Sequence, residues 1–103
     1  MRAKRKLSVQ NMTGRELVAW NVRRLRVERE LSAETLATQS GVDRVYLSRI
    51  ERALANPSVD ILERLASVLG VEIGELLAVP ARGERRPEPL PGGRRSRGAR
   101  NAD

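Results

Sequence analysis

Closely spaced helix start signals limit residues 13–79 to short helices. Thr13 and Glu16 have the spacing of a capping box, in which each side chain bonds the other residue's backbone N–H. Four segments begin with a residue whose side-chain oxygen can cap the first turn: Thr13, Ser32, Asp43 and Ser58. Two segments end at a glycine that can take the left-handed conformation: Gly41 and Gly70.

These signals predict an all-α fold of five helices. The predicted helices run from 13 to about 29, 32 to 41, 43 to about 52, 58 to 70, and about 72 to 78. No segment alternates apolar and polar residues with a period of two, which excludes a regular half-buried strand. We therefore expect one compact helical domain over residues 13–79.

The composition argues against enzymatic and metal-binding functions. The chain has no Cys and no His, so thiolate ligands, imidazole ligands and the commonest general base are all missing. No motif organises its carboxylates, Ser or Lys into a catalytic site, and no phosphate-binding glycine loop is present. We expect no catalytic residue, no metal and no cofactor.

The net charge of +7 is divided unevenly along the chain. Residues 1–13 contribute +4, residues 80–103 contribute another +4, and residues 14–79 contribute −1. We interpret residues 1–12 as a basic arm and residues 80–103 as a disordered tail rich in Arg, Pro and Gly. No apolar run is long enough to span a membrane, so we expect a cytoplasmic protein. Any nucleic-acid binding by the central segment must depend on where its arginines lie.

Residues 32–52 have the spacing of a helix-turn-helix. Ala37 is small where two helices approach closely, and Gly41 permits the sharp reversal between them. Leu47 and Ile50 would hold the following helix against the domain. On a helical wheel the opposite side of that helix carries Arg44, Val45, Ser48, Arg49 and Arg52. Such a side can contact base edges, whereas the alternative is an amphipathic helix with solvated arginines.

Residues 17–79 resemble the Cro/lambda-repressor-like helix-turn-helix family, also called the XRE family. The similar stretches are NVRRLRVERELSAETLA, GVDRVYLSRIER and NPSVDILERLASVLGVEIGELL. The run DRVYLSRIER is most similar to small single-domain members, including controller proteins of restriction–modification systems. The resemblance implies a bacterial, sequence-specific DNA-binding transcriptional regulator or repressor. Such a protein is usually a homodimer on a palindromic operator, with the third helix in the major groove.

The resemblance also implies roles for individual residues. The base-reading positions are Arg44, Val45, Ser48 and Arg49. The DNA-backbone candidates are Ser32, Tyr46, Arg52 and Asn56. Arg26 and Glu51 match a family pair that joins the first and third helices, with a surface pairing as the alternative. The expected dimer contacts are Leu76, Leu77 and Val79, which a monomer would leave poorly covered.

Three positions depart from the family pattern. Ala33 stands where members often have a Gln that contacts DNA. Glu30 and Ala53 stand where members often have Gly, at two helix ends. A non-glycine residue there costs roughly 1 kcal/mol if its backbone is left-handed.

Two further hypotheses remain open from the sequence. The chain could be an antitoxin or anti-regulator whose tail binds a partner protein and which also binds its own promoter. Trp20 lies away from the apolar stripe of the first helix. It could be a partly exposed side chain that packs over the fifth helix or the arm, or it could form a protein contact.

Overall fold

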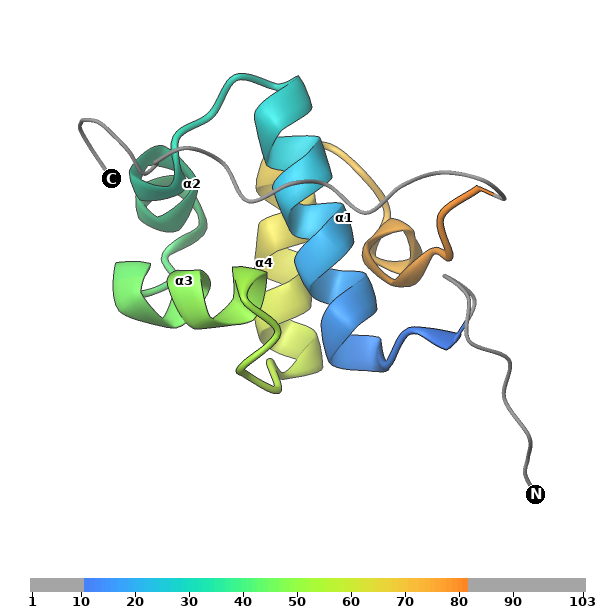
Figure 1. Ribbon diagram of the computed structural model, residues 1–103. Helices are drawn as coiled ribbons and strands as arrows, with labels where there is room; N and C mark the ends of the chain where they lie inside the picture. The colour runs from blue at the N-terminus through green and yellow to red at the C-terminus, as the bar shows by residue number, and fades with distance from the viewer. Residues whose placement is uncertain (1–10, 82–103) are drawn as a thin grey trace.

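The computed structural model describes residues 11–81. The predicted arm at residues 1–12 and tail at residues 80–103 therefore lie almost entirely outside the described residues. Within 11–81, the helices are α1 (Gly14–Glu28), α2 (Ala33–Ser40), α3 (Arg44–Glu51) and α4 (Val59–Leu69), followed by the 3-10 helix η2 (Ile73–Leu77). Figure 1 shows α1 and α4 side by side at the centre, with α2 and α3 on one flank and η2 on the other. The described residues contain no strand, so the all-α prediction is confirmed.

The prediction of a fifth helix at residues 72–78 needs correction. The segment is a five-residue 3-10 helix, so the domain has four α-helices within residues 11–81. Its first residue follows Glu72, whose side chain makes no cap hydrogen bond, and the backbone becomes extended again at Ala78. A segment this short, with Gly74 in its interior, has too little propensity and too few hydrogen bonds to form an α-helix.

The predicted N-caps are confirmed. Thr13 Oγ1 accepts from the Glu16 backbone N–H at 3.2 Å, and Glu16 Oε1 accepts from the Thr13 N–H at 2.9 Å, which completes the capping box. The N-cap side chains of the other three α-helices each accept from the N–H three residues on: Ser32, Asp43 and Ser58. Each helix therefore begins where a local polar contact satisfies its first free N–H groups.

All four α-helices end in the same hydrogen-bonded turn around a residue with positive φ. These residues are Glu30 (φ 56°), Gly41 (φ 72°), Ala53 (φ 61°) and Gly70 (φ 75°). The N–H of each donates three residues back, and the N–H of the next residue donates five residues back. This is a Schellman motif, and it normally has glycine at the left-handed position. Two of the four turns therefore carry the strain that the sequence predicts for non-glycine residues at such a position.

A single apolar core lies between the helices. Its fully buried members include Val22 of α1, Leu36 of α2, Leu47 of α3 and Leu65 of α4. Because every helix contributes to this core, the position of α3 is fixed by contacts with α1 and α2. No helix in residues 11–81 has the length and apolar content needed to cross a membrane.

Two exposure expectations near η2 are wrong. Leu76 is 0% exposed and belongs to the core, so a monomer covers it completely. The reason lies in α1, where the Asn21 Nδ2 group is 3.1 Å from the Leu76 carbonyl oxygen and 2.9 Å from that of Ala78. These bonds hold the backbone of η2 against α1, where the Leu76 side chain lies in the core. Trp20 was expected to be partly exposed, and it is only 4% exposed.

Candidate nucleic-acid interface

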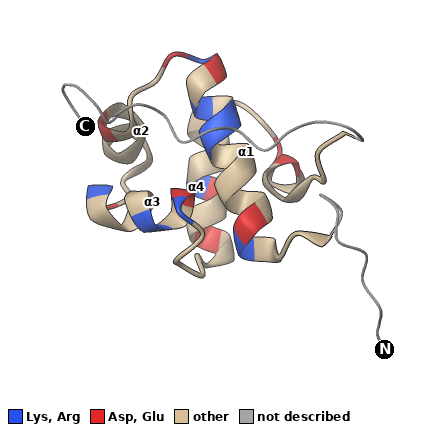
Figure 2. Ribbon diagram, in the orientation of Figure 1, with Lys and Arg blue, Asp and Glu red and all other residues tan. Residues whose placement is uncertain are grey.

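Helix α3 separates its side chains into a buried side and an outward side. Leu47 and Ile50 face the core, and Glu51 is buried beside them. Val45 on the other side is 68% exposed, and Arg49 and Arg52 are also exposed. Arg44 and Ser48 are partly exposed. Figure 2 shows basic residues on α3, and Glu51 is the one acidic residue between Arg44 and Arg52.

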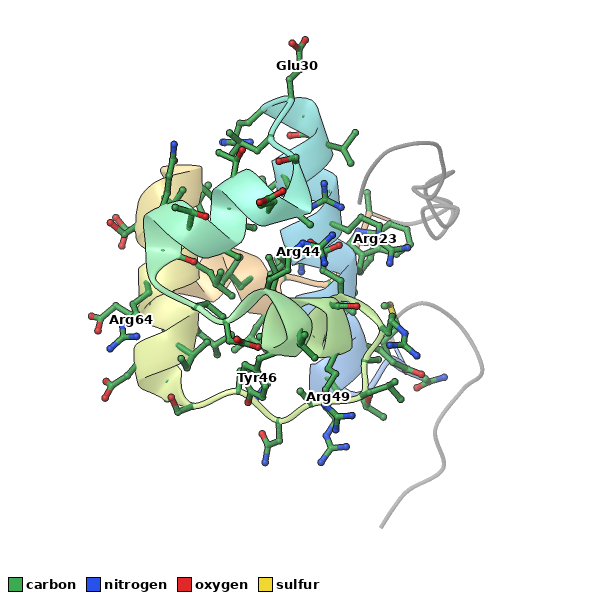
Figure 3. All side chains as sticks on the ribbon, turned by 90° about the vertical axis from the view of Figure 1, so that its left-hand side faces the viewer. Arg23, Glu30, Arg44, Tyr46, Arg49 and Arg64 are labelled. Atoms are coloured by element: carbon green, nitrogen blue, oxygen red, sulfur yellow. The ribbon has the colours of Figure 1, made fainter. Side chains whose placement is uncertain are left out.

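In Figure 3, where Arg44, Tyr46 and Arg49 are labelled, α3 lies on the side of the domain that faces the viewer. Arg49 extends away from the helix bundle, and its Nη2 group donates to the Leu54 carbonyl at 3.0 Å. This bond uses one of the five N–H groups of the guanidinium, whose planar fork suits carboxylate, phosphate and base acceptors. Arg44 lies in the first turn of α3, just after the Asp43 N-cap.

The four candidate backbone contacts are not equivalent. Ser32 is exposed, but its hydroxyl already accepts from the Thr35 N–H at 2.9 Å and donates to the Thr35 hydroxyl at 2.9 Å. The free N–H groups at the start of α2 are therefore the donors that remain there. Asn56 and Arg52 are exposed, whereas Tyr46 is partly buried and packs against the core.

A buried ion pair joins α1 to α3. Arg26 Nε donates to Glu51 Oε2 at 2.7 Å, and Arg26 Nη2 donates to Glu51 Oε1 at 2.9 Å. Both residues are only 8% exposed. The two hydrogen bonds give the pair the bidentate geometry that a buried ion pair needs to offset its desolvation. Arg26 Nη1 also donates to the Leu31 carbonyl at 2.9 Å. One side chain of α1 thus holds both the end of α3 and the entry to α2.

Two other arginines, which the sequence analysis did not single out, make similar contacts: Arg23 of α1 and Arg29, the C-cap residue of that helix. Arg23 Nη2 donates to the Glu51 carbonyl at 3.2 Å, and Arg29 Nε donates to the Leu69 carbonyl at 2.6 Å. Arg23, Arg26 and Arg29 are three residues apart, so they lie along one side of α1 and its C-cap. We call these three residues the arginine row. Their regular spacing is a signal in the sequence, although it does not identify the acceptors.

The candidate dimer residues lie away from α3. Leu77 is 44% exposed and Val79 is 48% exposed, at η2 and just after it, whereas Leu76 is in the core. In Figure 1, η2 and α3 pack on different sides of α1. Among residues 11–81 no group of His, Cys, Asp and Glu side chains has an arrangement that could hold a metal ion.

Comparisons with known proteins agree with this geometry. The family model described as "Helix-turn-helix" matches residues 22–76. A hypothetical transcription factor of Neisseria meningitidis is 41% identical over 66 residues, which are 64% of this chain and 62% of the relative's length. The chain therefore spans less than two thirds of that relative.

Two solved structures have a similar fold. The restriction–modification controller protein C.AhdI of Aeromonas hydrophila is 39% identical, with a TM-score of 0.58, and the match covers 60% of this chain and 94% of that one. SinR, described as the master regulator for biofilm formation, is 39% identical in its complex with DNA. Its TM-score is 0.57, and the match covers 59% of this chain and 98% of that one.

Proposed function

This chain belongs to the helix-turn-helix family, and on that premise we propose that it is a sequence-specific DNA-binding transcriptional regulator. The observation that carries the proposal is the outward side of α3. Its exposed charges are all arginines, since its single carboxylate, Glu51, is buried and paired with Arg26. The described domain is slightly acidic overall, so a general basic charge does not explain this side of the helix.

We place α3 in the major groove of DNA. Arg44 and Arg49 would contact guanine edges, Val45 would contact a thymine methyl group, and Ser48 would adapt to either strand's bases. Val45 is 68% exposed, so its methyl groups are accessible for that contact. Arg52, Asn56, Tyr46 and the N–H groups after Ser32 would contact phosphates and fix the register.

We propose further that two copies bind a palindromic operator. Leu77 and Val79, which are exposed and lie away from α3, would form the contact between the copies. Two α3 helices about 34 Å apart would then enter successive major grooves on one face of the duplex. Leu76 takes no part in this contact because it is buried within one copy.

Selection of binding sites from random DNA tests the proposal directly. We expect enrichment of two inverted half-sites whose centres are about 10 base pairs apart, or a multiple of that spacing. Enrichment of a single half-site would contradict the dimer and retain the base-reading role of α3. Recovery of unenriched DNA would overturn the proposed function as a whole.

A further inference from the structure

The two arginines that contact Glu51 do different things. Arg26 alone bonds both carboxylate oxygens, at 2.7 and 2.9 Å. Arg23 Nε is 3.6 Å from Glu51 Oε1 and makes no hydrogen bond, although it is buried. Arg23 is therefore not needed to neutralise Glu51. Burying a second cation beside one carboxylate has a desolvation cost, and the carboxylate is already neutralised by Arg26, so charge neutralisation does not offset that cost.

What Arg23 does supply is a donor to the last turn of α3. The final carbonyls of a helix lack partners within the helix. Here the Ser48 carbonyl accepts from Arg52 N, the Arg49 carbonyl from Leu54 N, and the Ile50 carbonyl from Ala53 N. The Glu51 carbonyl accepts from Arg23 Nη2 at 3.2 Å. One of the four terminal acceptors of α3 is thus satisfied from α1, by a cation placed favourably at the negative end of the helix dipole.

We propose that Arg23 is a positioning residue for α3 and thereby helps to determine which DNA sequence the protein selects. This inference rests on the proposed function, in which α3 reads bases. Helix α3 has eight residues and is about 12 Å long. A tilt of about 10° at its Glu51 end would move the Arg44 end by about 2 Å, which exceeds the roughly 0.5 Å tolerance of a precise site. Holding the carbonyl of Glu51 therefore fixes where Arg44 meets the bases.

Arg24 provides a matched control at the neighbouring position. It belongs to the same helix and carries the same charge, but it contacts Asn21, Glu28 and Glu75 and makes no contact with α3 in the described hydrogen bonds and ion pairs. Arg23→Gln and Arg24→Gln remove the same charge from the full chain. Any loss of general electrostatic attraction to DNA should be similar in both.

The experiment measures the Kd for the site that the wild type selects and the Kd for random DNA, below the melting temperature of each variant. We expect Arg23→Gln to lower the ratio of the two affinities by about tenfold, the size of one mismatched base pair, and Arg24→Gln to leave the ratio unchanged. Arg23→Lys keeps the charge but has one nitrogen at its tip. Since an ammonium group on a flexible stem reproduces the position of Nη2 and its bond to the Glu51 carbonyl less well, we expect an intermediate loss, about threefold.

The results separate the two proposals. A wild type without sequence preference would overturn the proposed function itself. If the wild type has a sequence preference and the folded Arg23→Gln variant retains that preference in full, the positioning role alone is overturned. If Arg23→Gln does not fold, the ratio of the affinities for the selected site and for random DNA is compared between Arg23→Lys and the wild type, and an unchanged ratio overturns the positioning role.

Discussion

The arginines of α1 and those of α3 have the same chemistry and different surroundings. The arginine row of α1 donates to two helix-terminal carbonyls, the Leu31 carbonyl at the entry to α2 and one buried carboxylate, all within the domain. Arg49 of α3 and its C-cap Arg52 lie on the outside. The described hydrogen bond from their side chains to the fold is that of Arg49 to the Leu54 carbonyl. Substitutions in the two groups should therefore change different measurements.

The difference also explains why net charge is a poor guide to this domain. Residues 14–79 carry nine arginines against ten acidic residues, for a charge of −1. Three of those arginines form the arginine row, and each of them donates to at least one acceptor inside the fold. A surface that attracts DNA can therefore exist on a slightly acidic domain, provided that its arginines are grouped on one helix.

The largest effect is expected at the Glu51 carboxylate, which lies beside Arg23 and Arg26 of the arginine row. Glu51→Ala leaves Arg26 buried without its partner and should reduce the free energy of unfolding by about 3–5 kcal/mol. Urea denaturation monitored by circular dichroism would measure the loss. Glu28→Ala is the control, because the Arg24–Glu28 pair is exposed and worth only roughly 0.3–0.5 kcal/mol. Equal losses in the two variants would show that burial does not distinguish these ion pairs.

The next effect concerns binding to DNA. Arg44→Ala should weaken binding to the selected site by about 1–3 kcal/mol and relax one base position, while random DNA is affected less. Arg64→Ala removes the same charge from α4 and serves as control, since Arg64 is exposed and lies outside α3. Titrations of labelled DNA at fixed salt would provide both affinities. If Arg44→Ala weakens binding to random DNA equally, Arg44 contacts the backbone and reads no base.

The parts of this structure that could be predicted from sequence depend on residues a few positions apart. The N-caps at Thr13, Ser32, Asp43 and Ser58 bond to residues three positions on, so the sequence contains both partners. The outward side of α3 follows from its helical period. The roles of Arg44, Val45, Ser48 and Arg49 in base reading stay a prediction.

The parts that were missed depend on residues that are far apart in the chain. Asn21 and the carbonyls of η2 are separated by 55 and 57 positions, and Arg23 and Glu51 by 28. No local pattern indicates that Asn21 holds η2 inward, and for that reason Leu76 was wrongly expected to be poorly covered. The acceptors in these contacts are backbone carbonyls, which every residue has, so composition and spacing cannot identify them.

The smallest expected effect lies at the helix ends that the arginine row holds. Ala53 follows α3 with φ 61° and Gly70 follows α4 with φ 75°. In both helices a residue of the arginine row donates to a carbonyl just before that position. Ala53→Gly should raise the free energy of unfolding by about 1 kcal/mol, because glycine has no Cβ to oppose a left-handed backbone. Gly70→Ala should lower it by a similar amount, since a Cβ there meets nothing within 4 Å and adds backbone strain alone. Thermal unfolding of both variants measures whether the two changes in the free energy of unfolding are similar in size and opposite in sign. A loss of stability in Ala53→Gly would mean that the strain at Ala53 is smaller than the entropy that glycine adds to the unfolded chain.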